Sequence, residues 1–296
     1  MATIGFIGAG AMGAPMIGHL LDAGHELQVF TRRRESAQPV LDRGARYAAS
    51  PAEAARGAEF VCVNVTNTAD VAGVLFDAGG VAEGAAPGTV VIDFSTISAV
   101  ATRDFAQRLA QRSIEMLDCP VSGGAAGARK ANLSIIVGGK AEVLERARPI
   151  LARLGTTITH IGGHGAGQVV KACNQIVQVV NIEGIAEATL FARANGVDPA
   201  KMLVALQAGM AGSKMLDLMG PKMAARDFAA GIEARLHQKD FGLIIEMTQS
   251  LGLSMPAVAL VSQQLNALVG NGWGRDDTSS LLRVLEGANR AAANDD

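Results

Sequence analysis

Three glycines near the N-terminus have the spacing of a phosphate-binding turn. The segment GAGAMG (8–13) directly follows a strand-like run and opens a helical one. The first glycine permits a tight bend, the second lets the backbone approach a pyrophosphate, and the third lets the helix pack on the strand. The N–H groups at the helix N-terminus then attract the phosphates. Because a second strand-like run follows within about thirty residues, we predict a dinucleotide site, rather than a turn without a ligand, at Gly8, Gly10, Ala11, Met12 and Gly13.

The end of the second strand-like run bears on which dinucleotide binds. An acid there would hold the ribose 2′-hydroxyl of NAD, but the sequence has Thr31-Arg32-Arg33-Arg34. An arginine can pair with the 2′-phosphate of NADP through charge-assisted hydrogen bonds, and the missing carboxylate removes a repulsion. We therefore expect Thr31 and Arg32 to contact the cofactor and NADP to be preferred to NAD. A solvated basic loop is the alternative.

A second candidate anion site follows a later strand-like run. In DCPVSGG (118–124), Gly123 and Gly124 lack β-carbons and can present bare N–H groups, with the Ser122 hydroxyl as a further donor. Such a nest suits a substrate carboxylate. A flexible turn between strand and loop explains the same residues equally well, so this segment alone leaves the choice open.

Four polar side chains share one stripe of a long apolar helical segment. They are Lys171, Asn174, Gln175 and Gln178, spaced i, i+3, i+4 and i+7, which places them on one helix face. The stripe faces either solvent or a wet internal cleft, and its amides, with one lysine, favour the cleft. The segment HQKD (237–240) lies in another helical pattern and by itself is typical of a surface ion pair.

The elements that must position these residues form two groups along the chain. Up to about residue 160, nearly continuous apolar strands alternate with helices, which implies a mostly parallel sheet covered on both faces. We predict an α/β fold with a Rossmann-type doubly wound sheet. The expected strands are 3–7, 26–30, 59–65, 89–94, 114–118, 133–137 and 157–161, and the helices between them include 12–23, 51–57, 98–112 and 141–154.

After residue 164 helical periods dominate, which predicts an all-helical C-terminal domain. Its first helix, of nearly thirty residues, would span about 43 Å and is expected at the core. The glycine-rich GGHGAG (162–167) marks the boundary between a dinucleotide-binding domain, 1–163, and a substrate and oligomerisation domain, 164–296; the final AAANDD (291–296) is expected to fray. The helices expected are 166–194, 199–208, 212–225, 234–251, 256–269 and 277–289.

Composition excludes several classes of protein. The 26 Lys and Arg against 28 Asp and Glu give a net charge of −2, which argues against a nucleic-acid binder. The three cysteines are far apart and the five histidines lack metal-binding spacing, so we expect reduced thiols and no metal. The N-terminus enters a strand without a signal-peptide profile, and the most apolar stretch is interrupted by charges. We expect a cytoplasmic protein without a membrane partner.

Four strings in this order carry a resemblance over about residues 3–290: GFIGAGAMGAPM, DCPVSGGAAGARKANLSIIVGG, GHGAGQVVKACNQ and HQKD. In them the chain resembles the β-hydroxyacid dehydrogenases, a family that includes 3-hydroxyisobutyrate dehydrogenases and several semialdehyde reductases. The strings VTNTADVAGVLF, NIEGIAEATLFARANGVDP and HQKD are most similar to the tartronate semialdehyde (2-hydroxy-3-oxopropionate) reductase subgroup. The family habit of dimers and tetramers implies a homodimer or homotetramer.

The resemblance also implies roles for individual residues. Lys171 matches the catalytic lysine, and Ser122, Gly123 and Gly124 match the loop that binds the substrate carboxylate. The substrate-orienting amide is Asn174 or Gln175, because family members differ in its distance from the lysine. Further cofactor contacts are implied at Val65, Thr66, Thr96 and Lys239. The sequence departs from the family at Ala131-Asn132, where Gly-Thr is usual, and at Thr31-Arg32, where an acid or a neutral residue is often seen.

The implied reaction is the NAD(P)-dependent interconversion of a small semialdehyde carboxylate and its hydroxyacid. The first choice is reduction of 2-hydroxy-3-oxopropionate (tartronate semialdehyde) to glycerate, with Lys171 stabilising the charge that develops on oxygen and delivering a proton. The alternatives are a 3-hydroxyisobutyrate dehydrogenase and a glyoxylate or succinic semialdehyde reductase. A non-catalytic dinucleotide-binding scaffold, the alternative of another class, would be expected to lack the lysine.

Overall fold

The computed structural model describes residues 1–289, and the chain divides into two compact units. The first unit is Met1–Lys171 and the second begins at Ala172. The division falls inside helix α9 (Ala166–Ala194), beyond the glycine-rich segment at which the sequence suggested a domain boundary. The final AAANDD, expected to fray, lies outside the described residues.

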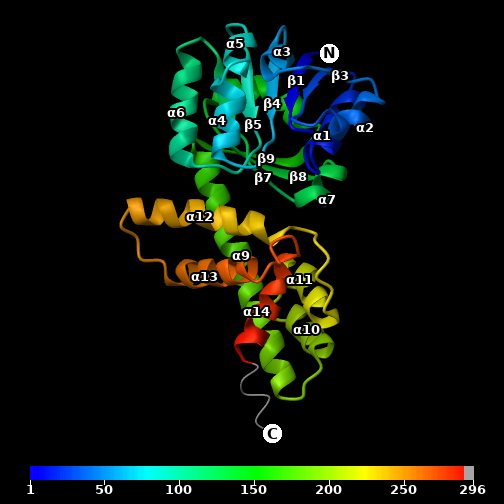
Figure 1. The fold of residues 1–296 in the computed structure, drawn as a ribbon, viewed down its shortest axis with the longest axis vertical. Helices are drawn as coiled ribbons and strands as arrows, with labels where there is room; N and C mark the ends of the chain where they lie inside the picture. Colours follow the sequence, from blue (N-terminus) through cyan, green and yellow to red (C-terminus); the bar gives the residue numbers. More distant parts are fainter. Residues whose placement is uncertain (290–296) are drawn as a thin grey trace. The chain divides into compact units, whose positions relative to one another are not determined.

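The first unit is built on a sheet with helices on both faces, as Figure 1 shows. The strand order is β3-β2-β1-β4-β5-β6-β8-β7, and β9 pairs with β8. All pairs are parallel except β6 with β8 and β7 with β8. The strands are β1 (Thr3–Ile7), β2 (Glu26–Phe30), β3 (Arg46–Tyr47), β4 (Phe60–Val63), β5 (Val90–Asp93), β6 (Glu115–Asp118), β7 (Val121–Ser122), β8 (Leu133–Gly138) and β9 (Gly155–Gly162). The predicted Rossmann-type sheet is confirmed.

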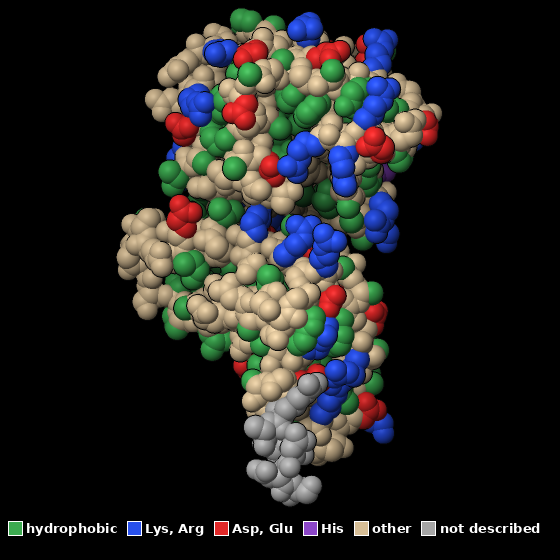
Figure 2. Space-filling view, viewed as in Figure 1, with side chains coloured by type: hydrophobic (Ala, Val, Ile, Leu, Met, Phe, Trp, Pro, Cys, Tyr) green, Lys and Arg blue, Asp and Glu red, His purple; other side chains and the backbone are tan. Residues whose placement is uncertain are grey.

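Two apolar layers hold helices on opposite faces of this sheet. Alternate strand residues point to opposite sides, so that Phe6 packs with α1 and α8 whereas Ile7 packs with α4 and α6. The helices of this unit are α1 (Gly13–Asp22), α2 (Gln38–Leu41), α3 (Pro51–Ala55), α4 (Thr68–Phe76), α5 (Val81–Gly84), α6 (Ala99–Ala110), α7 (Gly124–Arg129) and α8 (Ala141–Leu151), with a 3₁₀ turn at Arg34–Ala37. On the face shown in Figure 2, side chains of both charges are interspersed over this unit.

Several helices begin where a polar side chain satisfies the first free backbone N–H groups. Ser50, Asn67, Ser98 and Ser213 each accept such a bond, at the starts of α3, α4, α6 and, in the second unit, α11 (Lys214–Ala225), as capping requires. The sequence pattern did not predict β3, β7, α2, α4, α5 or α7. Strands of two residues are too short to show alternation, and α4 is apolar nearly all round, so neither gives a clear period.

The second unit is helical, and α9 runs along its core. Apolar side chains of α9 such as Val179, Ile182 and Ala186 pack with Phe241 and Leu265 from later helices. The other helices are α10 (Pro199–Gln207), α11 (Lys214–Ala225), α12 (Ala234–Ser250), α13 (Pro256–Gly270) and α14 (Leu281–Ala288), the last preceded by a 3₁₀ turn at Thr278–Ser280. None of the helices described here combines the length and apolar character that crossing a membrane requires.

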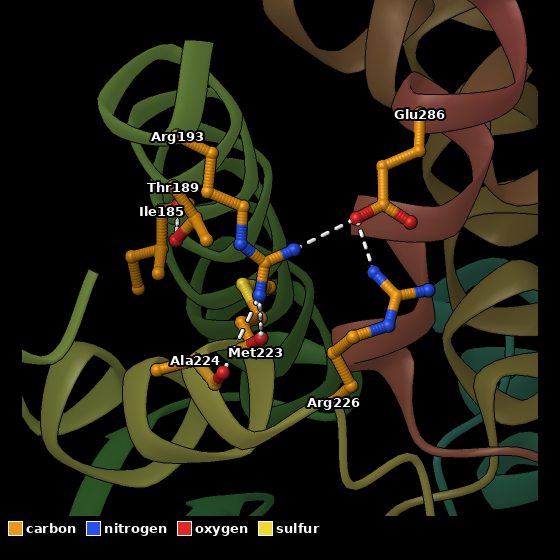
Figure 3. Close-up of polar contacts among 7 residues, drawn as sticks. All are labelled: Ile185, Thr189, Arg193, Met223, Ala224, Arg226 and Glu286. Carbon is orange, nitrogen blue, oxygen red and sulfur yellow. Dashed lines mark hydrogen bonds and ion pairs between the residues drawn. The ribbon is translucent and has the colours of Figure 1, made fainter. Parts of the chain in front are cut away.

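An ion-pair cluster joins three helices of the second unit (Figure 3). Arg193 of α9 donates to Glu286 of α14 at 2.8 Å, and Arg226, at the end of α11, pairs with the same carboxylate. Arg193 also donates to the carbonyls of Met223 and Ala224, at 3.1 and 3.3 Å. Because these carbonyls belong to the last turn of α11, the guanidinium satisfies acceptors that the helix itself leaves open.

Candidate active site

The carboxyl ends of four neighbouring strands bring together the residues expected to hold the cofactor. β1 leads into Gly8, β2 into Thr31, β4 into the loop with Val65 and Thr66, and β5 into the loop with Thr96. These strands are adjacent in the order β2-β1-β4-β5 and parallel. Their carboxyl ends therefore lie side by side at the same end of the strands, which is called the cofactor edge of the sheet below. The chain order reverses between β1 and β4, and such a switch point is where open α/β sheets bind dinucleotides.

The outer two glycines of the turn after β1 are required by close contacts within the protein. Gly8 has a φ of 100°, and a β-carbon there would lie 2.2 Å from the carbonyl oxygen of Asn64. A β-carbon on Gly13 would lie 1.9 Å from the carbonyl oxygen of Gly8. The turn is therefore tight, and α1 packs directly against the end of β1.

The middle glycine differs, because a β-carbon on Gly10 would meet no described atom within 4 Å. Its backbone thus borders open space at the start of α1, where Ala11 and Met12 complete the turn. As far as the structure describes the chain, α1 has neither a side-chain cap nor an acid in its first turn, so the positive end of the helix is left for an anion. This cradle fits a pyrophosphate.

The segment after β2 presents arginine beside a carboxylate. The buried Thr31 hydroxyl donates to the backbone carbonyl two residues on, at 2.6 Å, which shapes the turn. The Arg32 side chain is 80% exposed and its Nη1 lies 3.4 Å from Oδ1 of Asp70, in the first turn of α4. The guanidinium of Arg34 stacks 4.7 Å from the ring centre of Tyr47. Cationic side chains thus border the end of β2, where a 2′-phosphate would lie.

The loops after β4 and β5 are tied to each other by hydrogen bonds. The Val65 N–H donates to Oγ of Ser95 at 3.0 Å, and the Ser95 N–H donates to the buried carboxylate of Asp93 at 2.9 Å. Thr66 and Thr96 are the next residues along these two loops. The residues that precede them, Val65 and Ser95, are thus held by hydrogen bonds to the side chains of Ser95 and Asp93.

The predicted carboxylate loop connects a short strand to a helix. Ser122 belongs to β7 and pairs with Ser134 of β8, and α7 begins at Gly124. Gly123 and Gly124 have φ values of 132° and 59°, a backbone that residues with a side chain rarely adopt. Further along, Ala131 has a φ of 51°. The departure from the family's glycine thus leaves an alanine in the left-handed region, which is strained.

A buried acid fixes the start of α9, the helix that carries Lys171. The Asp118 carboxylate, at the end of β6, accepts the N–H groups of Gly165 and Gln168 at 2.8 and 3.1 Å. Burial raises the pKa of Asp118, although these two hydrogen bonds act in the opposite direction. Lys171 follows one turn later and is only 7% exposed. The lysine therefore projects from a helix end held against the sheet.

Two of the four polar residues in the α9 stripe are buried. Lys171 and Gln175 are buried, whereas the exposed positions of the same turns are the apolar Val169 and Val177, with Cys173 between them. An outer surface would show the reverse distribution, so the burial of Lys171 and Gln175 argues against a solvated face, one of the two alternatives; Asn174 and Gln178 are half-buried.

The amides of the stripe belong to the second unit and join a hydrogen-bonded chain there. Asn174 donates to Oε1 of Gln175 at 2.8 Å, and Gln175 donates to Oδ2 of the buried Asp240 at 2.6 Å. Lys239 lies 2.8 Å from Oδ1 of the same carboxylate. Lys239 and Asp240 are therefore not the isolated surface pair that their spacing alone suggested, since the acid is buried and shared.

Three of these residues were not predicted as part of the site: Asp118, Gln168 and Asp240. Each lies inside a string that carried the family resemblance, namely DCPVSGG, GHGAGQVVKACNQ and HQKD. Their partners are far away in the sequence, so composition and spacing gave no sign of the contacts.

Comparison with known proteins agrees with this geometry. A family model described as the NAD binding domain of 6-phosphogluconate dehydrogenase matches residues 3–162, and one described as NAD-binding of NADP-dependent 3-hydroxyisobutyrate dehydrogenase matches residues 165–285. The chain belongs to the β-hydroxyacid dehydrogenase family. The protein is therefore an NAD(P)-dependent oxidoreductase, as its resemblance implied.

Relatives in the β-hydroxyacid dehydrogenase family match nearly the whole chain. It is 38% identical to 2-hydroxy-3-oxopropionate reductase of Escherichia coli (strain K12), over 96% of this chain and 97% of that protein. It is 36% identical to an NAD-dependent L-serine dehydrogenase of Pseudomonas aeruginosa, over 97% and 98%. A solved structure, Mycobacterium tuberculosis 3-hydroxyisobutyrate dehydrogenase with L-serine, matches with a TM-score of 0.90 and 30% identity over 96% and 99% of the two chains.

Proposed function

We propose that the protein reduces a small semialdehyde carboxylate to its hydroxyacid, with 2-hydroxy-3-oxopropionate and glycerate as the best candidate pair. The observation that carries this proposal is the buried lysine on a helix end held against the cofactor edge of the sheet. The choice of substrate is supported by the relative of that name at 38% identity.

The cofactor would be held by the glycine turn at Gly8–Gly13 and by the loops after β2, β4 and β5. Gly10 offers open space for the pyrophosphate, and Thr96 lies on the loop expected near the nicotinamide ribose. Arg32 stands where a 2′-phosphate would be recognised, which supports NADP over NAD. On the second unit, Lys239 is proposed to contact the cofactor as well.

The nicotinamide, when bound, supplies a hydride to the aldehyde carbon. Negative charge then develops on the carbonyl oxygen, and Lys171 stabilises it and donates a proton to give the alcohol. Ser122, with the backbone of Gly123 and Gly124, binds the substrate carboxylate. In the reverse direction the neutral amine of Lys171 takes the hydroxyl proton.

We propose that Asn174, rather than Gln175, orients the substrate, because Asn174 is only half-buried whereas Gln175 is 4% exposed. Both ends of the Gln175 amide are already engaged, by Asp240 and by Asn174. We therefore assign Gln175 to holding Asn174 in place. Replacing Asn174 with Ala should raise KM for the acid more than Gln175→Asn does.

Other substrates in the family remain distinct candidates. The L-serine and 3-hydroxyisobutyrate dehydrogenase relatives support oxidation of a hydroxyacid, and glyoxylate and succinic semialdehyde are further aldehydes. A non-catalytic scaffold is disfavoured because the lysine is present and buried.

The protein is also proposed to form a homodimer or homotetramer. Large apolar side chains are exposed on the second unit, among them Val177, Phe191, Leu218 and Leu260, which are 67%, 73%, 59% and 52% exposed. Apolar side chains exposed in this number suit a surface that another subunit covers. Light scattering of the eluted protein measures the assembly directly, and a monomer at micromolar concentration would refute this part.

The function is tested by assaying a panel of small acids with NADH and with NADPH. The panel holds 2-hydroxy-3-oxopropionate, glyoxylate and succinic semialdehyde for reduction, and L-serine, glycerate and 3-hydroxyisobutyrate for oxidation. We expect the highest kcat/KM for 2-hydroxy-3-oxopropionate with NADPH. A tenfold higher value for another acid would replace the substrate assignment while leaving the reaction class intact.

The role of Lys171 is tested separately by Lys171→Ala. General acid–base catalysis is worth about 10²–10⁴ in rate. The turnover of Lys171→Ala should therefore fall at least about 100-fold, while the dinucleotide still binds. Lys201→Ala, at an exposed lysine of α10, is the matched control and should keep full activity. Turnover of Lys171→Ala within tenfold of the parent would refute the mechanism.

A further inference from the structure

We propose that Gln168 is a positioning residue that couples the cofactor loop after β5 to the turn of α9 that carries Lys171. This inference rests on the proposed function, because it assigns to Gln168 the alignment of the lysine with the nicotinamide. The groups concerned all belong to the first unit.

The side chain of Gln168 holds the loop after β5 on both sides of Thr96. Its Nε2 donates to the carbonyl of Ser95 at 2.8 Å, and its Oε1 accepts the N–H of Ile97 at 3.1 Å. Gln168 is only 3% exposed, so water does not compete for these bonds. The Gln168 amide therefore satisfies one backbone group on each side of Thr96, the Ser95 carbonyl and the Ile97 N–H. Thr96 is the residue expected near the nicotinamide ribose.

The backbone of Gln168 is held as firmly as its side chain. Its N–H donates to Oδ2 of Asp118 at 3.1 Å, while Oδ1 accepts the Gly165 N–H at 2.8 Å. A β-carbon on Gly167 would lie 2.8 Å from both the carbonyl oxygen and Oδ2 of Asp118. The first turn of α9 thus lies directly on the end of β6, with no room for side chains between them.

Lys171 stands one helical turn beyond Gln168, on the same face. Long side chains on a helix lean toward its N-terminus, over the residue three or four positions earlier. Lys171 and Gln168 are therefore neighbours on the turn whose glutamine amide holds the loop after β5. The loop is fixed further by Ser95, which accepts the Val65 N–H, so one amide links the lysine turn to the loops after β4 and β5.

The coupling predicts a loss in catalysis rather than in binding. A displacement of reacting groups by about 1 Å can cost about 10²-fold in rate. Gln168→Met keeps the length of the side chain but removes both hydrogen bonds, and we expect its kcat to fall at least about tenfold. KM and the dissociation constant of NADPH should stay within about threefold of the parent, because the groups that bind them are retained.

Two further variants separate positioning from general stability. Gln168→Glu keeps the acceptor for the Ile97 N–H but, when ionised, sets a second carboxylate oxygen against the Ser95 carbonyl, so its kcat should fall at least as far as that of Gln168→Met. Thr89→Val is the matched control, because it removes a buried hydrogen bond, from Oγ1 to the carbonyl of Ala58 at 3.1 Å, at the opposite edge of the sheet. It should lower the melting temperature and leave kcat within twofold.

The experiment measures kcat and KM on the best substrate of the panel, NADPH binding by fluorescence titration, and hydrogen exchange at Ile97. Support requires the fall in kcat, a larger isotope effect with deuterated NADPH, and faster exchange of the Ile97 amide in Gln168→Met. If Gln168→Met does not fold, Gln168→Glu is measured in its place.

Two results would overturn the inference: a kcat within twofold of the parent, or an equal loss of kcat in Thr89→Val. Either leaves the proposed function standing as long as Lys171→Ala abolishes turnover. Retained turnover in Lys171→Ala is instead a failure of the proposed function, whatever Gln168→Met does.

Discussion

Glu183 is a carboxylic acid buried in α9, and its ionisation should make the stability of the second unit depend on pH. The residue is 4% exposed, and neither carboxylate oxygen has a hydrogen-bond partner among the described residues. Burial, and then repulsion from Glu187 one turn on, raise its pKa from 4.5 to about 7. The folded protein thus keeps this proton at a pH at which the unfolded chain has lost it.

The sign and size of the effect follow from that difference. An acid whose pKa is raised on folding contributes its full stability below the unfolded value of 4.5 and loses it as the pH rises through about 7. At about 1.36 kcal/mol per pH unit, the upper limit is about 3 kcal/mol. Because Glu187 is exposed and water screens part of the interaction, we expect about 1–2 kcal/mol.

Glu183→Gln removes the ionisation and keeps the shape of the side chain. Its free energy of unfolding should match the parent near pH 4.5, where both side chains are neutral, and exceed it by about 1–2 kcal/mol at pH 8. Urea titration at both pH values measures this difference. The single tryptophan, Trp273, lies in the second unit, with the Arg283 guanidinium 3.8 Å from its ring centre, so its fluorescence reports on that unit.

Glu187→Gln is the matched control, since it removes a carboxylate from the exposed side of the same helix. Glu187→Gln should change the difference in unfolding free energy between pH 4.5 and pH 8 by less than half as much as Glu183→Gln does, because it removes only the repulsion between the two carboxylates. A difference between Glu183→Gln and the parent that is the same at pH 4.5 and pH 8 would refute the reasoning, because the buried carboxyl would then titrate as it does in the unfolded chain.

Four further changes test the first unit, three of them in the glycine turn after β1 and at the end of β2. Gly10→Ala should leave the melting temperature unchanged and raise the Kd of NADPH at least tenfold (about 1.4 kcal/mol), because the new β-carbon meets only the space left for the pyrophosphate. Gly13→Ala should instead destabilise the fold by about 1–3 kcal/mol, because its β-carbon would lie 1.9 Å from a backbone oxygen. Arg32→Ala should weaken NADPH about tenfold and leave NADH unchanged, and equal losses for both in a titration would contradict a 2′-phosphate role. Ala131→Gly should stabilise the protein in a urea titration by about 1 kcal/mol by relieving a left-handed alanine, whereas a loss of stability would show that its φ is not strained.

The local pattern of the sequence was sufficient for the longer strands and for helices such as α1, α6, α8 and α9, and it indicated the type of chemistry that some residues could support. The apolar period of residues 166–194 predicted α9 with its observed ends, and the glycine turn after 3–7 predicted the start of α1. Such features depend on neighbours within a few residues, so spacing alone reveals them. The catalytic and binding roles came from the family resemblance, because a lone lysine or a Ser-Gly-Gly segment is compatible with many functions.

Only the tertiary structure decided which polar residues act together and which faces are buried. Gln168 meets Ser95 across 73 residues of sequence, Asp118 meets Gln168 across 50, and Gln175 meets Asp240 across 65. Contacts over such separations depend on strand order and helix packing, which no local period encodes. The same holds for the early turns of α9, where Lys171 and Gln175 are buried while Val169 and Val177 are exposed. Spacing placed these side chains on one face, and only the packed chain determined what that face meets.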